Sequence, residues 1–291
     1  MIWIFSAGGR SGTSWLAKMI ASSLDGGKWN EPLVGKMLGE FYFRRMARNP
    51  NFIFADVYRD SWEQAIRKLL IDGVLVRYPD AAERRVVVKE PTGSIGSPLI
   101  MGALPESRMV LIVRDPRDIV ASVLDGHKEG SWSARERRWV RRSSNAEVGG
   151  PVEPVVATRQ GARDSPRMTR RRAKNVMEHL DHARSAYAAH PGPRFQVTYE
   201  ELRADTTGTM RRLFSALDLP VDDSKVDLGV EAHSISNVPE HRKGPGQKVR
   251  KGSPGGFEED LTPQQRSIIE KIAAPMLNEF YPGWRAEQTA D

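Results

Sequence analysis

The N-terminal segment constrains the fold more than any other part of the chain. The apolar run Ile2–Phe5 leads into a loop of small residues, Ser6–Gly12, and apolar residues at helical spacing follow over Thr13–Leu24. A strand, a small-residue loop and a helix in this order direct several backbone N–H groups at one point, where the helix dipole adds partial positive charge. Glycines in the loop permit the dihedral angles that such a cradle needs. The sequence therefore predicts an anion-binding loop after the first strand.

The rest of the chain alternates between strand and helix patterns. The runs Arg85–Lys89 and Met109–Val113 are apolar almost throughout, as in strands of a parallel sheet that helices cover on both faces. A weaker, alternating run lies at Arg194–Thr198. Helical patterns lie at Trp62–Ile71, Arg117–Leu124, Met168–Ala189, Thr206–Leu217 and Gln264–Phe280. This alternation predicts one α/β domain over residues 1–291, a three-layer parallel sheet flanked by helices and similar to nucleotide kinases.

Two segments show no clear period. Residues 143–167 are rich in Gly, Pro, Ser and Arg, a composition that predicts a flexible insert. Residues 233–257 combine many Gly and Pro residues with basic side chains. Loops of this length are often functional, so we expect this one to take part in binding.

Composition narrows the class of protein. Hydrophobic residues make up 39% and charged residues 28%, which is typical of a soluble globular protein. Cysteine is absent, so disulfides and thiolate metal sites are excluded. The N-terminal apolar run is too short to span a membrane and lacks a basic leader, so we expect a cytoplasmic protein without stable membrane insertion. The net charge of +7 favours anionic partners but does not choose among them.

The loop departs from the nucleoside triphosphate pattern G-x-x-x-x-G-K-[ST]. Ala7 stands in place of the first Gly, and Thr13 stands in place of the Lys that contacts the terminal phosphates. The third predicted strand ends in Arg114, and no apolar strand ends in an obvious metal-binding Asp. The loop thus keeps the anion cradle without the ATPase apparatus, and Arg10 can supply positive charge. The alternative function is a P-loop kinase. The alternative structural interpretation is a turn that only connects the strand to the helix and binds nothing.

Two motifs point to one family. Arg10-Ser11-Gly12-Thr13-Ser14-Trp15 resembles the 5′-phosphosulfate loop of the sulfotransferases, usually [KR]-S-G-T-[ST]. Val113–Ser122 resembles their 3′-phosphate motif, R-[DN]-P-[RK]-D followed by a helix and a Ser. The resemblance implies that Arg114 and Ser122 bind the 3′-phosphate of 3′-phosphoadenosine 5′-phosphosulfate (PAPS), which leaves as the bisphosphate PAP. Taken alone, the second motif could be a strand-end Arg paired with an Asp.

Two further segments extend the resemblance. Tyr199-Glu200-Glu201-Leu202 looks like the family's Y-E-[DE]-L, and Arg250–Gly255 looks like the loop R-K-G-x-x-G that closes over the 3′-phosphate and adenine. Gly256-Phe257 stand where the family usually has an acidic residue and Trp, a departure in the last turn of that loop. The donor contacts implied by the resemblance are Gly9, Arg10, Ser11, Gly12, Thr13, Ser14, Trp15, Arg114, Ser122, Tyr199, Arg250, Lys251 and Gly252.

Sulfuryl transfer places demands like those of phosphoryl transfer. The group moves in line between two oxygens, and the protein mainly positions it and stabilises charge. Negative charge grows on the bridging oxygen of the leaving group. Arg10, Thr13 and Ser14 are placed to meet that charge together with the loop N–H groups, so we expect no metal.

The acceptor must also lose a proton. In cytosolic small-molecule sulfotransferases the base is a His within K-T-H, but this chain has Lys89-Glu90-Pro91 there. That triplet is similar to K-D-P of the tyrosylprotein sulfotransferases, whose base is a Glu about as far beyond the loop Arg as Glu31 is. The resemblance implies Glu31 as base and Lys89 as a cation on the transferring group, with Glu90 as second candidate. Alternatively, neither residue has a catalytic role: Glu31 is then a solvated or helix-capping acid, and Lys89 is a surface residue.

Partners are less defined. We expect a small-molecule or glycan acceptor carrying a hydroxyl or amine, selected by the basic insert and by the aromatic residues Phe41, Tyr42, Phe43, Phe52 and Phe54, which could equally pack in the core. No nucleic-acid partner is expected, because the Arg-rich stretches carry no recognition motif. His179 and His182 share a helix face, but no third metal ligand is evident. The oligomeric state stays open.

Overall fold

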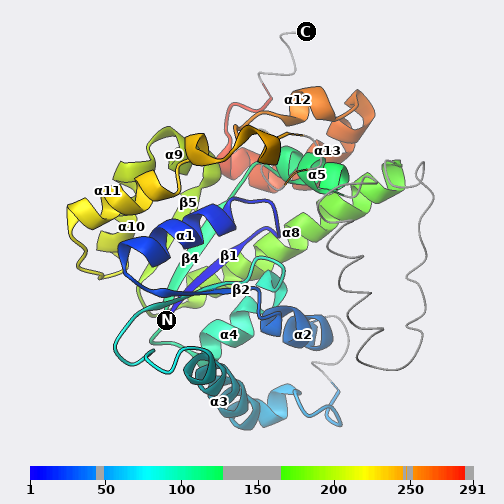
Figure 1. The fold of residues 1–291 in the computed structure, drawn as a ribbon. Helices are drawn as coiled ribbons and strands as arrows, with labels where there is room; N and C mark the ends of the chain where they lie inside the picture. Colours follow the sequence, from blue (N-terminus) through cyan, green and yellow to red (C-terminus); the bar gives the residue numbers. More distant parts are fainter. Residues whose placement is uncertain (44–48, 127–164, 245–246, 248–251, 286–291) are drawn as a thin grey trace, which may run out of the picture. The chain divides into compact units, whose positions relative to one another are not determined.

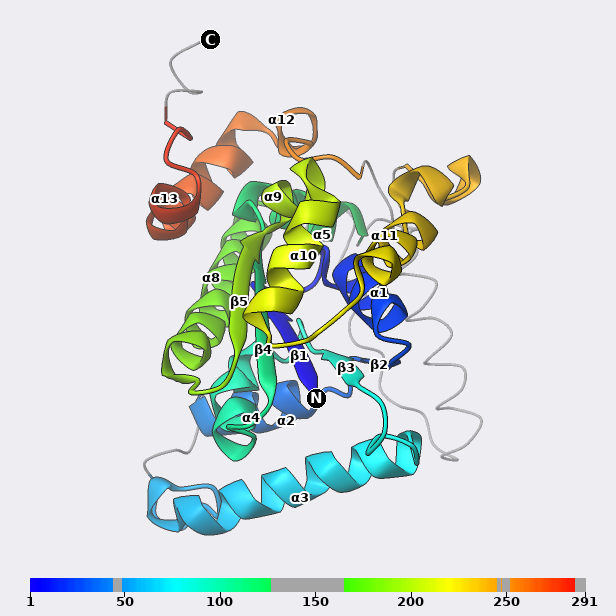
Figure 2. The same ribbon diagram turned by 90° about the vertical axis from the view of Figure 1, so that its left-hand side faces the viewer.

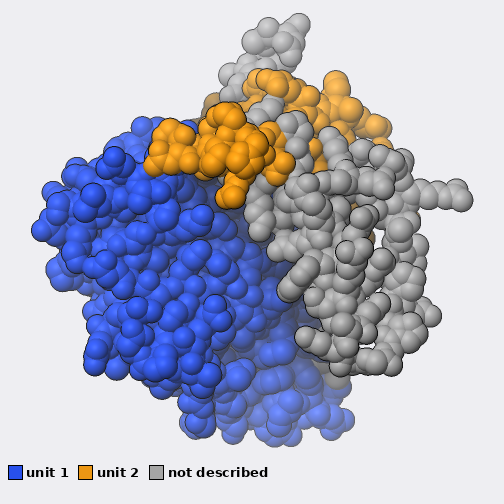
Figure 3. All heavy atoms as spheres, in the orientation of Figure 1, with its two compact units in different colours: residues 1–114, 175–234 blue, residues 115–174, 235–291 orange. Residues whose placement is uncertain are grey.

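The computed structural model describes residues 1–43, 49–126, 165–244, 247 and 252–285. The chain forms two compact units, which Figure 3 colours separately. Unit 1 comprises Met1–Arg114 and Asn175–Ser234, and unit 2 comprises Asp115–Lys174 and Ile235–Asp291. Whether they act as the single domain predicted from the sequence stays a prediction.

Unit 1 is built on a five-stranded parallel sheet with the strand order β2-β3-β1-β4-β5 (Figure 1). The strands are β1 (Ile2–Ser6), β2 (Gly27–Asn30), β3 (Val86–Lys89), β4 (Arg108–Val113) and β5 (Arg194–Thr198). The predicted parallel α/β sheet is therefore confirmed, including the weakest of the four predicted strands. Because all strand pairs are parallel, the five carboxyl ends lie along one edge of the sheet.

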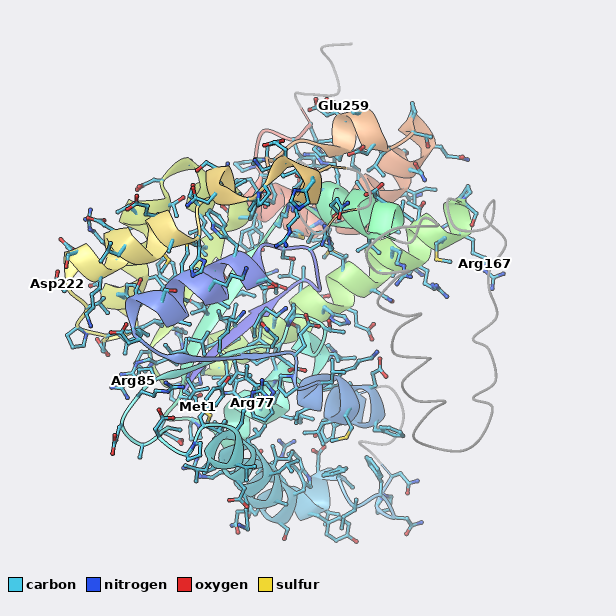
Figure 4. The ribbon with its side chains drawn as sticks, in the orientation of Figure 1. Met1, Arg77, Arg85, Arg167, Asp222 and Glu259 are labelled. Carbon is cyan, nitrogen blue, oxygen red and sulfur yellow. The ribbon has the colours of Figure 1, made fainter. Side chains whose placement is uncertain are left out.

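The strand missed from the sequence is β2. Its sequence, Gly-Lys-Trp-Asn, has a single large apolar residue and no alternation, and it lies at the edge of the sheet. It pairs with β3 from Gly27↔Val86 to Asn30↔Lys89. The guanidinium of Arg77, labelled in Figure 4, lies 5.8 Å from the centre of the Trp29 ring. Pairing with a fully buried neighbour, rather than local propensity, thus makes this segment a strand.

The sheet lies between α8 on one side and α1 and α11 on the other, as Figure 2 shows. The helices of unit 1 are α1 (Thr13–Ser23), α2 (Val34–Phe41), α3 (Arg59–Arg77), α4 (Ser97–Ala103), α9 (Tyr199–Ala204), α10 (Thr206–Ala216) and α11 (Asp223–Ala232). α8 (Pro166–Ala189) runs through the boundary between the units. The six predicted helices are present. The helices not predicted are short, and short apolar segments give little periodicity.

The core of unit 1 fixes α1 against the sheet. Leu16, Ala17 and Ile20 of α1 are fully buried and belong to one apolar cluster with Ile4 and Ile112 of the neighbouring strands β1 and β4. Burying each large aliphatic side chain contributes about 1.5–3 kcal/mol. This packing leaves the residues between β1 and α1 as a short, tightly held loop at the carboxyl edge.

Unit 2 contains α5 (Pro116–Gly126), α12 (Phe257–Asp260) and α13 (Pro263–Phe280). Asp118 of α5 is fully buried, and its carboxylate accepts hydrogen bonds from the backbone N–H groups of Gly255 (3.0 Å) and Phe257 (2.9 Å). Arg117 pairs with Asp115 at 2.8 Å. Asp118 thus ties the end of the predicted donor loop to α5.

The structure differs from the sequence prediction in the two segments expected to be loops, residues 143–167 and 233–257. Pro166 and Arg167, assigned from the sequence to the insert, begin α8, because Pro suits a first helical turn. Residues 143–164 lie outside the described residues, as do Arg250 and Lys251. Within 233–257, two 3₁₀ turns, Ile235–Asn237 and Glu240–Arg242, form where a loop was expected.

Candidate active site

The predicted site residues of unit 1 gather at the carboxyl edge of the sheet. The loop Arg10–Trp15 follows β1, Glu31 follows β2, Lys89 ends β3, Arg114 follows β4 and Tyr199 follows β5. Ligands of parallel α/β sheets bind at this edge. Residues far apart in the sequence are therefore brought to one place by the parallel topology.

The phosphate loop adopts a strained, internally bonded form. Three of its residues have positive φ: Gly8 (114°), Arg10 (75°) and Gly12 (84°). The hydroxyl of Ser6 donates to the carbonyl of Gly8 at 2.6 Å, and that of Ser11 donates to the same oxygen at 3.0 Å. The side chain of Ser11 is thus engaged within the loop, so Ser11 can meet a ligand through its backbone N–H.

Any substitution of Gly12 would strain this arrangement. It precedes the first turn of α1 in a left-handed conformation, and a Cβ at this position would lie 2.5 Å from the ring of Tyr199. The close approach of Tyr199 therefore requires glycine.

A chain of polar contacts links the loop to the predicted base. The ammonium of Lys89 donates to the hydroxyl of Ser14 at 3.1 Å and to the carboxylate of Glu31 at 2.5 Å. The other oxygen of Glu31 accepts a hydrogen bond from the hydroxyl of Thr92 at 2.6 Å. The Lys89 side chain is 7% exposed and that of Glu31 is 35% exposed. A buried cation thus stands between the phosphate loop and a partly exposed carboxylate.

Glu31 is held in an unusual backbone conformation. Its φ is 46°, and that of Leu33, two residues on, is 61°. Left-handed conformations cost non-glycine residues roughly 1–2 kcal/mol each. The backbone N–H of Glu31 donates to the carbonyl of Lys89 at 2.7 Å, which extends the β2–β3 pairing by one residue. Non-glycine strain of this kind accumulates at functional sites.

Glu90 has a different environment. It is fully buried, and one carboxylate oxygen accepts a hydrogen bond from the backbone N–H of Leu33 at 3.1 Å. Burial, together with the neighbouring charge of Glu31, raises the pKa of Glu90 to about 7, against the opposing effects of the nearby backbone N–H groups and of the Lys89 ammonium. The Glu90 carboxyl thus faces the first turn of α2 and not solvent.

Arg114 joins the ends of β4 and β1. Its guanidinium donates to the carbonyl of Arg10 at 3.0 Å and lies 4.4 Å from the centre of the Tyr199 ring. Tyr199 in turn packs edge-on against Trp15, with ring centres 6.3 Å apart, and the indole N–H of Trp15 donates to the carbonyl of His233 at 2.8 Å. Arg114, the part of the second motif that belongs to unit 1, is therefore in direct contact with the phosphate loop.

The remaining predicted residues fall elsewhere. Ser122 lies on α5 and Gly252 follows the undescribed residues 248–251, both in unit 2. Tyr42 is buried and its hydroxyl donates to Asp56, whereas Phe41 and Phe43 are 55% and 37% exposed. Core packing thus accounts for Tyr42. Among the described residues, no group of His, Cys, Asp or Glu is arranged to hold a metal ion.

Thr92 and His179 of unit 1, and Asp118 of unit 2, were not assigned their contacts from the sequence. Thr92 bonds the predicted base, and the imidazole of His179 lies 3.4 Å from the Pro91 carbonyl oxygen. Asp118 holds Gly255 and Phe257. For Asp118, its place within the R-[DN]-P-[RK]-D motif was an available signal. Thr92 and His179 gave none, because their importance depends on contacts across 61 and 88 residues of chain.

Comparison with known proteins identifies the family. The family model of the sulfotransferase domain matches residues 2–281. The chain belongs to the sulfotransferase family. The solved structure of mouse sulfotransferase SULT7A1 complexed with PAP resembles this sulfotransferase with a TM-score of 0.50 at 16% identity, covering 99% of this chain and 87% of that chain.

Two further solved structures are similar at lower scores. Retinol dehydratase in a complex with retinol and PAP gives a TM-score of 0.48 at 16% identity, covering 96% of this chain and 81% of its own. Sulfotransferase STF9 from Mycobacterium avium gives 0.48 at 14% identity, covering 96% and 76%. No curated protein matches the chain by sequence.

Family membership confirms the predicted enzyme class. The protein is a sulfotransferase and transfers a sulfuryl group, and the P-loop kinase alternative is not favoured. The likeness to the mouse enzyme confirms the fold. Within the described residues, no helix is long and apolar enough to cross a membrane.

Proposed function

We propose that this sulfotransferase binds PAPS at the carboxyl edge of its sheet and transfers the sulfuryl group to a hydroxyl or amine of a small-molecule or glycan acceptor, with Glu31 as base. The observation that carries the proposal is the continuous contact from Ser14 through Lys89 to Glu31. It joins a loop suited to the 5′-phosphosulfate to a carboxylate suited to receive a proton. PAP in the solved complexes of two similar proteins agrees with this donor.

The chemical step follows from these positions. The acceptor O–H or N–H gives its proton to the Glu31 carboxylate while the acceptor atom forms a bond to sulfur. The bond between sulfur and the bridging oxygen breaks in line, and PAP leaves with the negative charge. Lys89 stands where the sulfuryl oxygens pass, and the loop N–H groups, Arg10 and the hydroxyls of Thr13 and Ser14 meet the leaving oxygen. These cations and dipoles supply the charge stabilisation, so the step is proposed to need no metal.

The 3′-phosphate is assigned to Arg114. Its guanidinium lies beside the loop, stacked on Tyr199, and a planar guanidinium suits two hydrogen bonds to a phosphate. Gly9, Trp15 and Tyr199 complete the donor contacts proposed within unit 1. Ser122, Arg250, Lys251 and Gly252 stay donor contacts predicted from the motifs alone, and a cytoplasmic location also stays a prediction.

Calorimetry tests the donor assignment. PAP should bind in the presence of EDTA, and adenosine 5′-monophosphate, which lacks the 3′-phosphate, should bind at least tenfold more weakly. Arg114→Met should weaken PAP binding by about tenfold or more while leaving the monophosphate nearly unchanged, because about 1.4 kcal/mol corresponds to tenfold. Equal affinity for both nucleotides would contradict the assignment.

A second experiment tests the base. Turnover is measured as PAP release from PAPS in the presence of a panel of phenols, amines and monosaccharides. Glu31→Gln should lower turnover by about 10²–10⁴-fold, the range for general base catalysis, with PAP affinity unchanged. Glu40→Gln, on α2 and away from the Lys89 contact, is the matched control and should turn over normally. Near-normal turnover of Glu31→Gln would remove Glu31 from the mechanism.

A further inference from the structure

Glu90, the second carboxyl of the site, lies where it can fix the position of Glu31. Glu90 directly follows β3, and its backbone N–H donates to the carbonyl of Ile4 in β1 at 2.9 Å. Its side chain is fully buried at the junction of β3 with the start of α2. A carboxyl in this position has no path to an acceptor that approaches from solvent, in contrast to the partly exposed Glu31.

The Glu90 carboxyl caps α2 from a distant part of the chain. The N-cap residue of α2, Leu33, has no side-chain cap of its own, and its backbone N–H bonds to the Glu90 carboxyl at 3.1 Å. The first N–H groups of a helix lack partners within the helix, so a cap here fixes where the helix begins. Glu90 therefore determines the position of the turn before α2.

That turn carries Glu31. It comprises Glu31, Pro32 and Leu33, and both of its non-proline residues have positive φ. A strained turn persists only where surrounding contacts over-determine it. The contacts are the bond from the Glu31 N–H to the Lys89 carbonyl on one side and the bond from the Leu33 N–H to Glu90 on the other.

The charges agree with this division of roles. Glu31 and Lys89 are the charged groups that act on Glu90, and Lys89 makes its short contact to Glu31. If both carboxyls were ionised, one buried ammonium would have to balance two negative charges. A Glu90 carboxyl that holds its proton leaves the charge of Lys89 available to Glu31 and to the sulfuryl group.

We propose that Glu90 is a positioning residue: its buried carboxyl holds the left-handed turn before α2 so that the carboxylate of Glu31 meets Lys89 and Thr92. The proposal rests on the proposed function, in which Glu31 is the base. It replaces the role of second candidate base that the sequence offered for Glu90.

Gly93 offers a second way to disturb the same contact. A Cβ at Gly93 would lie 2.1 Å from a carboxylate oxygen of Glu90. Gly93→Ala should therefore displace the Glu90 carboxyl without removing it. Gly102→Ala, where the nearest atom would be an ordinary 3.5 Å away, is the matched control.

The test compares Glu90→Gln with Glu90→Ala. Glutamine keeps an oxygen acceptor for the Leu33 N–H, so Glu90→Gln should retain at least a third of wild-type kcat. Glu90→Ala and Gly93→Ala should lower kcat by tenfold or more with the KM for PAPS and the affinity for PAP unchanged. Turnover is again PAP release from PAPS with the panel of acceptors. Glu90→Gln as inactive as Glu31→Gln would make Glu90 the base and overturn the proposal, as would normal kcat in Glu90→Ala.

Hydrogen exchange tests the same contact without turnover. In Glu90→Ala, the amides of residues 33–36 should exchange at least tenfold faster than in wild type, and in Glu90→Gln they should exchange at the wild-type rate. Unchanged exchange in Glu90→Ala would overturn the proposal. Failure of PAP to bind the wild-type protein would instead count against the proposed function, so the two failures are distinguishable.

Discussion

At the scale of single residues, environment separates the two carboxyls that the resemblance ranked as first and second candidate base. Glu31 and Glu90 flank the same lysine, Lys89, in the site. Glu31 has a partly exposed side chain in contact with Lys89 and Thr92, whereas Glu90 is fully buried and bonded to the backbone N–H of Leu33. A base must reach the acceptor, and a buried cap cannot. Solvent access, which depends on packing, thus favours Glu31 as the proposed base.

The raised pKa of Glu90 makes folding stability depend on pH. Its pKa is about 7 in the folded protein against 4.5 for an ordinary Glu. A raised folded pKa contributes stability below pH 4.5, and that contribution is lost as pH rises through 7. From pH 5 to pH 8, wild type should lose about 2–3 kcal/mol relative to Glu90→Gln, which cannot ionise. Urea unfolding of both proteins at the two pH values measures this, and parallel pH profiles would contradict it.

At the scale of elements, the sequence predicts the strands and helices that have a strong hydrophobic pattern, and it misses the short strands and helices. β1, β3 and β4 are continuous apolar runs, so they are recognisable without any knowledge of their partners. β2 and α2 are short, and contacts with β3 and with Glu90 define them. The segment that positions the proposed base is therefore the part of unit 1 that periodicity predicts least.

The phosphate loop is the element with the strictest residue requirement. Gly12→Ala should destabilise the protein by about 2–4 kcal/mol, because Ala resists a φ of 84° and its Cβ would meet the Tyr199 ring. Thermal unfolding should show a Tm lower by several °C. Gly9→Ala is the control, because its φ is not positive and no atom lies within 4 Å of its Cβ position. Equal Tm values for the two variants would show that Tyr199 does not constrain the loop.

At the scale of the whole molecule, the two compact units are joined by a continuous helix. The boundary falls between Lys174 and Asn175, within α8, and the chain also crosses it after Arg114 and after Ser234. If one unit unfolded alone, α8 would be interrupted in its middle and would lose backbone hydrogen bonds on both sides of the break. The units should therefore unfold together, in line with the single domain predicted from the sequence.

Calorimetric heating tests that expectation. Wild type should give one unfolding transition, and PAP at 100 times its Kd should stabilise the protein by about 2.7 kcal/mol and raise that transition as a whole. Two transitions, of which PAP raises only one, would show that the units are separate domains.

The amino-acid sequence by itself determined the parallel α/β fold, the phosphate loop and the sulfotransferase family. These depend on local patterns: apolar runs of strand length, small residues between a strand and a helix, and an Arg at a strand end. Such patterns are complete within about ten residues, so they can be recognised without a partner segment.

Only the tertiary structure supplies the contacts from which the roles of Glu31, Glu90 and Thr92 are proposed. Their chemistry depends on which side chain reaches solvent and which N–H meets which carboxyl, across 57 to 61 residues of chain. Parallel strands carry their carboxyl ends to one edge, and the order of the strands then decides which of those ends become neighbours. A contact of that range is a property of the packed sheet and of no segment alone.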